Sequence, residues 1–233
     1  RDMKRILAWS TVSALGTLTL LVGLPNEMAA LAFVAFVFAH ALYKAPLFFV
    51  AGIVDHATGT RVIDDLGGLR RFLPWTAAAA LLAALSMAGL PQTLGFVAKG
   101  TIKMAKELSD VAWIVGVSGI LVSAVALATA SVVAGRVFFG RADPAAHSSV
   151  PAESLRLLAP PLALGTIAIA VGSFPGLIEP LLFDAARVIA PSIGRNDADL
   201  GTDWALRVGT WWLVLALGVV IYARWDALHA GIE

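Results

Sequence analysis

Long apolar stretches separated by short polar segments form the main pattern of this sequence. A transmembrane helix needs about 20 mostly apolar residues, and six stretches meet this requirement. They are residues 7–24, 29–54, 74–108, 111–139, 157–174 and 204–223. A membrane β-barrel would instead show strands of about 10 residues in which apolar and polar positions alternate. The pattern therefore predicts an all-α protein, a polytopic transmembrane helix bundle with six spans.

Two stretches depart from a simple span. Residues 74–108 are too long for one straight crossing, and they contain Gly89, Pro91 and Gly95, which disfavour a continuous helix. We therefore predict one discontinuous helix that is broken near Pro91. Residues 176–190 are short and carry three charged side chains, so we expect them to lie at the membrane interface or to re-enter the membrane. A seventh span at this position is the alternative.

Basic residues divide unequally between the two ends of these spans. If residues 74–108 cross the membrane once, the end that holds the N-terminus carries ten Lys and Arg residues, and the opposite end carries five. Cytoplasmic segments of membrane proteins are enriched in Lys and Arg. This bias favours the single broken helix and predicts that both termini of the sequence lie on the cytoplasmic side.

Composition narrows the class of protein further. The chain has 233 residues, of which 59% are hydrophobic and 14% charged, whereas soluble domains average about 45–50% apolar and about 25% charged residues. This excess argues against a soluble enzyme, and the net charge of +1 argues against a nucleic-acid partner. Cysteine is absent, the sequence has no nucleotide-binding fingerprint, and its four histidines are scattered. We therefore expect no cofactor, no metal and no enzymatic chemistry.

Charged residues inside a span cost about 2.5–3.5 kcal/mol on insertion scales, so each one calls for a functional hypothesis. His40 and Lys44 lie in the middle of the second apolar stretch, and their spacing places them on one face of a helix. Pro46 follows and removes a backbone hydrogen bond, which predicts a helix defect that neighbouring helices or water must satisfy. A titratable pair beside such a defect favours a proton relay. The alternative is that Lys44 extends to the membrane surface and His40 is a packing residue.

Lys99 is the third candidate for a proton-carrying residue. It follows the predicted break at Pro91, and transporters place broken helices where ions pass. The alternative is that Lys99 begins a basic terminal turn with Lys103 and Lys106. We expect those two lysines to lie at the membrane interface.

Other polar residues are expected to be structural. Hydroxyl side chains of the first stretch should bond their own helix backbone; these are Ser10, Thr11, Ser13 and Thr17. Charged groups after the second stretch are expected to be solvated loop charges, with proton collection as the alternative; these are Asp55, His56, Asp64 and Asp65.

Three ordered motifs then indicate a family. They are RDMKRILAWSTVS at residues 1–13, HALYKAPLFF at residues 40–49 and LSMAGLPQTLGFVAK at residues 85–99. They resemble the D-x-K-R-x-L-A-[YW]-S-T-x-S, H-A-x-F-K-A-x-L-F and S-x-A-G-x-P-x-x-x-G-F-x-S-K elements of the antiporter-like family. That family comprises the large membrane subunits of respiratory complex I and of Mrp-type multisubunit Na⁺/H⁺ antiporters. The stretch GIVDHATGTR at residues 52–61 is similar to the A-type subunit of the Mrp branch.

The resemblance implies a function. His40, Lys44 and Lys99 would belong to a hydrophilic axis that conducts protons, coupled to Na⁺ extrusion, in a secondary transporter of the bacterial plasma membrane. Its partners would be the other antiporter subunits, the lipid bilayer, protons and Na⁺. The alternative is the proton-pumping membrane subunit of complex I.

The resemblance also implies an organisation. Residues 1–139 would form the second half of the antiporter-like core, and residues 140–233 would add further helices of the A-type subunit. Additional segments would precede and follow this sequence. Gly100 stands where the family often has an acidic residue, so Lys99 lacks that adjacent counter-ion.

Overall fold

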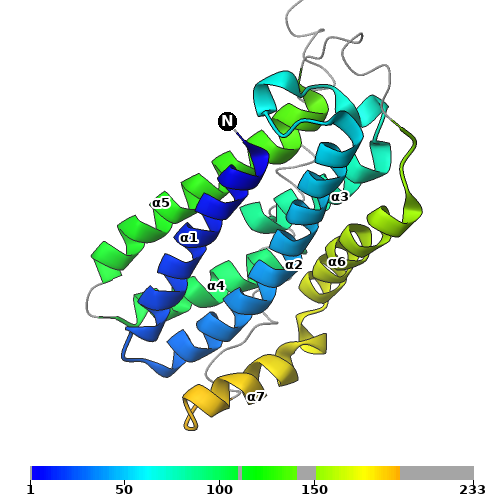
Figure 1. The fold of residues 1–233 in the computed structure, drawn as a ribbon. Coiled ribbons are helices and arrows are strands. Elements are labelled where there is room, and N and C mark those ends of the chain that lie inside the picture. Colours follow the sequence, from blue (N-terminus) through cyan, green and yellow to red (C-terminus); the bar gives the residue numbers. More distant parts are fainter. Residues whose placement is uncertain (1, 110–111, 141–150, 195–233) are drawn as a thin grey trace, which may run out of the picture. The chain divides into compact units, whose positions relative to one another are not determined.

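The computed structural model describes residues 2–109, 112–140 and 151–194, and every regular element in these ranges is a helix (Figure 1). Four segments are long and apolar enough to cross a membrane, judged by length and composition: α1 (Met3–Val22), α2 (Glu27–Thr58), Gly116–Phe139 and α6 (Leu155–Ser173). The shorter helices include α3 (Pro74–Ala88), α4 (Leu94–Glu107) and α7 (Glu179–Ile189). The predicted all-α class is confirmed.

The third of these long segments combines two helical forms. α5 (Ala112–Ala130) continues directly into the π-helical segment η3 (Ser131–Phe139). The sixth predicted span, residues 204–223, lies outside the described residues.

α2 is the central helix of the described bundle. It contacts α1, α3, α4, α6 and α7. Asn26 begins it by accepting a hydrogen bond from the backbone N–H of Ala29, and Gly59, with a φ of 72°, ends it in a left-handed conformation. Pro46 lies inside α2. The defect predicted at Pro46 therefore removes one backbone hydrogen bond but does not end the helix.

The predicted break near Pro91 is confirmed. α3 ends at Ala88 because Gly89, with a φ of 79°, takes a left-handed conformation, and the Gly89 N–H bonds back to the Ser86 carbonyl at 3.0 Å. Thr93 then begins α4, and its side chain accepts a hydrogen bond from the first turn of that helix. Turn and cap hydrogen bonds thus satisfy the backbone N–H groups of Gly89, Leu90, Thr93 and Phe96 at the break.

α3 and α4 together cross the bundle once. Asn26 Nδ2, in the turn between α1 and α2, donates to the carbonyl of Ala105 near the end of α4 at 3.1 Å. At the other end, Arg136 of η3 pairs with Asp64, in the loop after α2, at 2.7 Å. We call the end that holds Asp2, Asp64 and Arg136 the ionic end, and the end that holds Asn26 and Ala105 the Asn26 end. This connectivity supports the single discontinuous helix.

Two glycines allow tight packing around the break. A Cβ on Gly95, in the first turn of α4, would lie 1.8 Å from the carbonyl oxygen of Ser86 in α3. A Cβ on Gly172, in α6, would lie 2.1 Å from the backbone carbonyl carbon of Thr93. Gly95 therefore lies in α4 rather than in the break itself, and its role is the close approach of α3 and α4. Gly172 brings α6 against the break in the same way.

A distant carboxylate caps the start of α3. Glu153, in the segment before α6, accepts hydrogen bonds from the backbone N–H of Trp75 at 3.1 Å and of Thr76 at 2.7 Å. It also accepts a hydrogen bond from the Thr76 hydroxyl at 2.7 Å. The residue that precedes α3 supplies no side-chain cap, so Glu153 satisfies backbone N–H groups that have no partner within the helix.

The short helix α7 contains 11 residues. At 1.5 Å per residue its length is about 16 Å, which is far less than the roughly 30 Å of a bilayer core. This length supports the interfacial or re-entrant placement of residues 176–190 and argues against a seventh span.

Gly95→Ala is expected to destabilise the protein, because the added methyl group would overlap the Ser86 carbonyl. Overpacking of this kind costs about 1–3 kcal/mol. Gly100→Ala is the matched control, since it lies in the same helix and a Cβ there meets nothing within 4 Å. The measurement is the unfolding temperature of the detergent-purified full-length protein. Equal unfolding temperatures for the two variants would contradict the packing role.

Glu153→Ala is expected to lower the stability of the α3 start by about 0.5–2 kcal/mol, which is typical of a lost N-terminal cap. Asp184→Ala is the control, because Asp184 makes an exposed ion pair with Arg187 at 3.5 Å and exposed pairs contribute little. Hydrogen exchange of the Trp75 and Thr76 amides measures the effect directly. Unchanged protection of these amides would show that Glu153 does not cap α3.

Candidate functional site

Lys44 is buried in the middle of α2, with 5% of the residue exposed. Its Nζ donates a hydrogen bond to the backbone carbonyl of Leu7 at 2.9 Å and a second to the hydroxyl of Ser10. Both acceptors belong to α1, so the ammonium points across the bundle to a neighbouring helix. The alternative in which Lys44 extends to the membrane surface is wrong.

The carbonyl of Leu7 is a shared acceptor. The hydroxyls of Ser10 and Thr11 donate to it at 2.8 and 3.0 Å, in addition to the bond from Lys44. The expectation that Ser10 and Thr11 bond their own helix backbone is therefore confirmed. The second bond of Ser10, to Lys44, was missed from the sequence because it joins residues 34 positions apart.

His40 takes its polar partner from its own helix. Its Nδ1 lies 3.1 Å from the hydroxyl of Tyr43. Its ring packs edge-on against Phe36 and Tyr43, with centroid separations of 6.0 and 5.3 Å. Helical spacing places His40 on the same face as Lys44, but the hydrogen bond of His40 leads to Tyr43.

Lys99 folds back over the break. Its Nζ donates to the carbonyl of Ala88, the last residue of α3, at 2.6 Å. A Cβ on Gly89 would lie 2.5 Å from the Lys99 side chain and would displace it, and the φ of 79° favours glycine at this position. A cation at a helix C-terminus is favourable because the last carbonyls lack helical partners. The structure thus joins Lys99 and the break into one unit.

A cavity of about 720 Å³ connects these features. It lies among α1, α2, α4 and α5, and it touches Ser10, Tyr43 and Lys99. Ser13 and Thr17 of α1 add hydroxyl groups to its wall, and the rest of the wall is mainly apolar. Lys44 is connected to this cavity by its hydrogen bond to Ser10, which lines it. The cavity therefore brings Lys99 together with the hydrogen-bond partner of Lys44, and it reaches His40 only through Tyr43.

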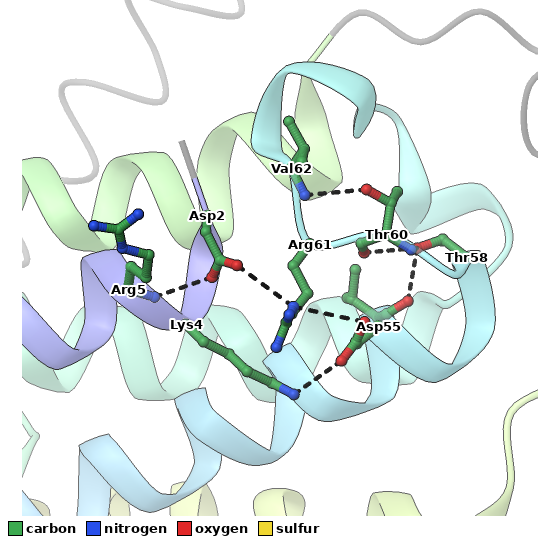
Figure 2. A network of polar contacts seen from close by, with 9 residues as sticks. Asp2, Lys4, Arg5, Asp55, Thr58, Thr60, Arg61 and Val62 are labelled. Atoms are coloured by element: carbon green, nitrogen blue, oxygen red, sulfur yellow. Dashed lines mark hydrogen bonds and ion pairs between the residues drawn. The ribbon is translucent and has the colours of Figure 1, made fainter.

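A network of ion pairs holds the start of α1 against the end of α2 (Figure 2). Lys4 pairs with Asp55 at 2.9 Å, and Arg61 pairs with Asp2 at 3.4 Å and with Asp55 at 3.9 Å. Asp55 was expected to be a solvated loop charge. It is instead a half-buried bridge between two basic side chains.

Asp2 also begins α1. Its carboxylate accepts a hydrogen bond from the Arg5 N–H at 3.0 Å. That bond, assisted by the positive charge of Arg61, holds the pKa of Asp2 below its ordinary value of 3.8. The resulting stabilisation is complete above this value and is lost as the pH falls through the lowered pKa. The backbone N–H of Met3 adds a bond to the Arg61 carbonyl at 3.0 Å, so the position of α1, and with it Ser10, is fixed from the ionic end.

Comparison with known proteins identifies the family. The family described as the transmembrane region of NADH:quinone oxidoreductase and Mrp antiporters matches residues 1–132. The chain belongs to this family. The match contains α1 to α5, and with them Lys44, Lys99, the break and the cavity wall.

Individual members of the family show the degree of similarity. A probable K(+)/H(+) antiporter A/B subunit of Rhizobium meliloti is 48% identical over 99 residues, covering 42% of this chain and 10% of that protein. The A1 subunit of an Na(+)/H(+) antiporter of Staphylococcus aureus is 32% identical over 209 residues, covering 80% of this chain and 26% of that protein.

The solved Mrp complex from Dietzia sp. DQ12-45-1b contains a chain that superimposes with a TM-score of 0.66. That chain is 32% identical, and the match covers 96% of this chain and 25% of that one. The chain thus spans about a quarter or less of the length of these relatives. The resemblance to the antiporter-like family, and the multi-pass membrane character that it implies, are confirmed.

Ser10→Ala is expected to destabilise the protein, because the buried Lys44 ammonium loses one of its two partners. Hydrogen bonds to charged groups contribute about 1.5–3 kcal/mol. Thr11→Val is the matched control, since Thr11 bonds the same Leu7 carbonyl but does not contact Lys44. The unfolding temperature of the purified full-length protein should fall more for Ser10→Ala, and the reverse order would contradict this role of Ser10.

Proposed function

We propose that this chain is part of the A-type subunit of a multisubunit Na⁺/H⁺ antiporter and that its helices carry protons through the membrane. The single observation that supports this most directly is the cavity that touches both Lys99 and Ser10, the partner of Lys44. Lysines in apolar surroundings are switchable proton carriers, because desolvation disfavours the charged form. The antiporter names of the relatives favour this branch over complex I.

The partners of the two lysines suit reversible proton transfer. Lys44 and Lys99 both donate to uncharged oxygens: those of Leu7 and Ser10, and that of Ala88. Such oxygens hold an ammonium without fixing its charge, as a carboxylate would. Cavity water gives a proton to the Ser10 oxygen, and the original Ser10 proton turns from Leu7 and passes to the neutral amine of Lys44. Ser10 is unchanged after the step, and Lys44 becomes an ammonium.

The cavity leads towards the Asn26 end. Its wall follows α1 from Ser10 to Leu20 and α4 from Lys99 to Glu107. The ionic end is the basic, cytoplasmic side under the charge rule, so the cavity would open towards the outer face of a bacterial plasma membrane. Protons taken up there would reach Lys99 first and Lys44 through Ser10.

The organisation of the antiporter follows from this assignment. Residues 1–139 carry the proton route, and residues 140–233 add helices of the A-type subunit. Among the described helices, α6 contacts the break at Gly172. A change in the protonation of Lys99 would therefore act on α6, in residues 140–233, through this contact. The other subunits of the complex and the bilayer are the partners, and Na⁺ extrusion is coupled to proton uptake through the changing charge of the lysines. The transport cycle needs no covalent chemistry.

Lys44→Ala and Lys99→Ala are expected to abolish Na⁺-driven proton movement, measured by a pH-sensitive dye in membrane vesicles that contain the full antiporter complex. Lys44→Arg should also fail, because a guanidinium keeps its charge but does not release its proton at neutral pH. The control is Lys103→Ala, whose side chain is 69% exposed and paired with Glu107. Full transport by Lys44→Ala or Lys99→Ala in an assembled complex would refute the proposed function.

A further inference from the structure

α4 carries three lysines on one side, and the structure gives them different surroundings. Lys99 contacts the break. Lys103 is 69% exposed and pairs with Glu107 at 3.6 Å. All three lysines line the same cavity, and Lys106 is half-buried whereas Lys103 is exposed. The sequence led us to expect both Lys103 and Lys106 at the membrane interface, and the structure adds that both line the cavity.

The neighbouring helix α5 is shaped to admit Lys106. A Cβ on Gly119 would lie 2.0 Å from Lys106 Nζ. Any side chain at position 119 would therefore displace the ammonium. Gly116, one turn earlier on α5, also lines the cavity, but a Cβ there meets nothing within 4 Å. Of these two glycines only Gly119 is in contact with Lys106, so the Lys106 ammonium lies against α5 in the wall of the cavity.

The position of Lys106 suits the outer part of the same route. Lys106 lies seven positions after Lys99 on α4, a rise of about 10 Å at 1.5 Å per residue. Lys106 lies next to Ala105, whose carbonyl accepts the bond from Asn26, so it is close to the Asn26 end. One cavity therefore extends along α4 from Lys99 at the break past Lys103 to Lys106 near the Asn26 end, a separation that a few water molecules span.

We propose that Lys106 is a third proton carrier, which takes up protons at the Asn26 end and passes them to Lys99. This proposal rests on the proposed function. In the step, the Lys106 ammonium gives a proton to cavity water, the water chain gives a proton to the neutral amine of Lys99, and Lys106 is left neutral. A proton from the outer solution then restores the Lys106 ammonium. No oxidant, metal or second substrate is required.

The test compares Lys106→Gln and Lys106→Arg in the full antiporter complex. Lys103→Gln and Lys103→Arg are the controls: Lys103 lines the same cavity, but its ion pair with the Glu107 carboxylate holds it in the charged form. The readout is the initial rate of Na⁺-driven proton movement in vesicles, expressed per assembled complex. Both Lys106 variants should be slower by roughly tenfold or more, as expected when a proton-transfer group is lost, and both Lys103 variants should stay within about twofold. A fast Lys106→Arg beside a slow Lys106→Gln would mean that only the charge matters and would overturn the proposal.

A second pair of variants tests the position of the Lys106 ammonium without replacing Lys106 itself. Gly119→Ala should displace the ammonium and slow transport, whereas Gly116→Ala should transport normally. Normal transport by the Lys106 variants and by Gly119→Ala, beside failure of Lys44→Ala and Lys99→Ala, would overturn the role of Lys106 and leave the proposed function in place. Normal transport by all of them would overturn both.

Discussion

Polar groups that lie away from water must find partners inside the protein, and this constraint shapes the described bundle. Lys44 meets it by crossing to α1, where a carbonyl and a hydroxyl receive its hydrogen bonds. Lys99 meets it by bonding the last carbonyl of α3. In both cases the partner is an uncharged oxygen of a helix that must be held within hydrogen-bonding distance. The positions of α1 and α3 relative to α2 and α4 are therefore part of the site itself.

The break in the crossing helix depends on close backbone contacts. Gly89 permits both the left-handed turn and the contact with Lys99, and Gly95 permits α4 to approach α3. α6 then packs its Gly172 against the other side of the same turn. A proton that leaves Lys99 removes a favourable cation from the end of α3. That turn lies in direct contact with Gly172 of α6, so the proposed proton route would act on α6 through this contact.

Ion pairs at the ionic end fix the position of α1, which carries the Ser10 partner of Lys44. The ion pairs among Asp2, Lys4, Asp55 and Arg61 join the start of α1 to the end of α2. Exposed ion pairs are weak individually, but this network is reinforced by a helix cap and a backbone hydrogen bond. Ser10 lies about two turns further along α1, so the register that presents its hydroxyl to Lys44 is set from this end.

Local features of the sequence were sufficient to predict the helices and the break at Pro91. They were also sufficient to select Lys44 and Lys99 as candidate site residues. Apolar length, glycine and proline at turns, and charge within an apolar run act over a few residues, so a single sequence contains them. Only the tertiary structure decided which oxygens hold Lys44, that Glu153 caps α3 and that Asp55 is a structural bridge. It also decided that Lys106 lies against Gly119 of α5. These contacts join residues far apart in the chain, such as Lys44 with Ser10 and Glu153 with Thr76. Their geometry depends on how helices pack, and no local pattern of residues records that packing.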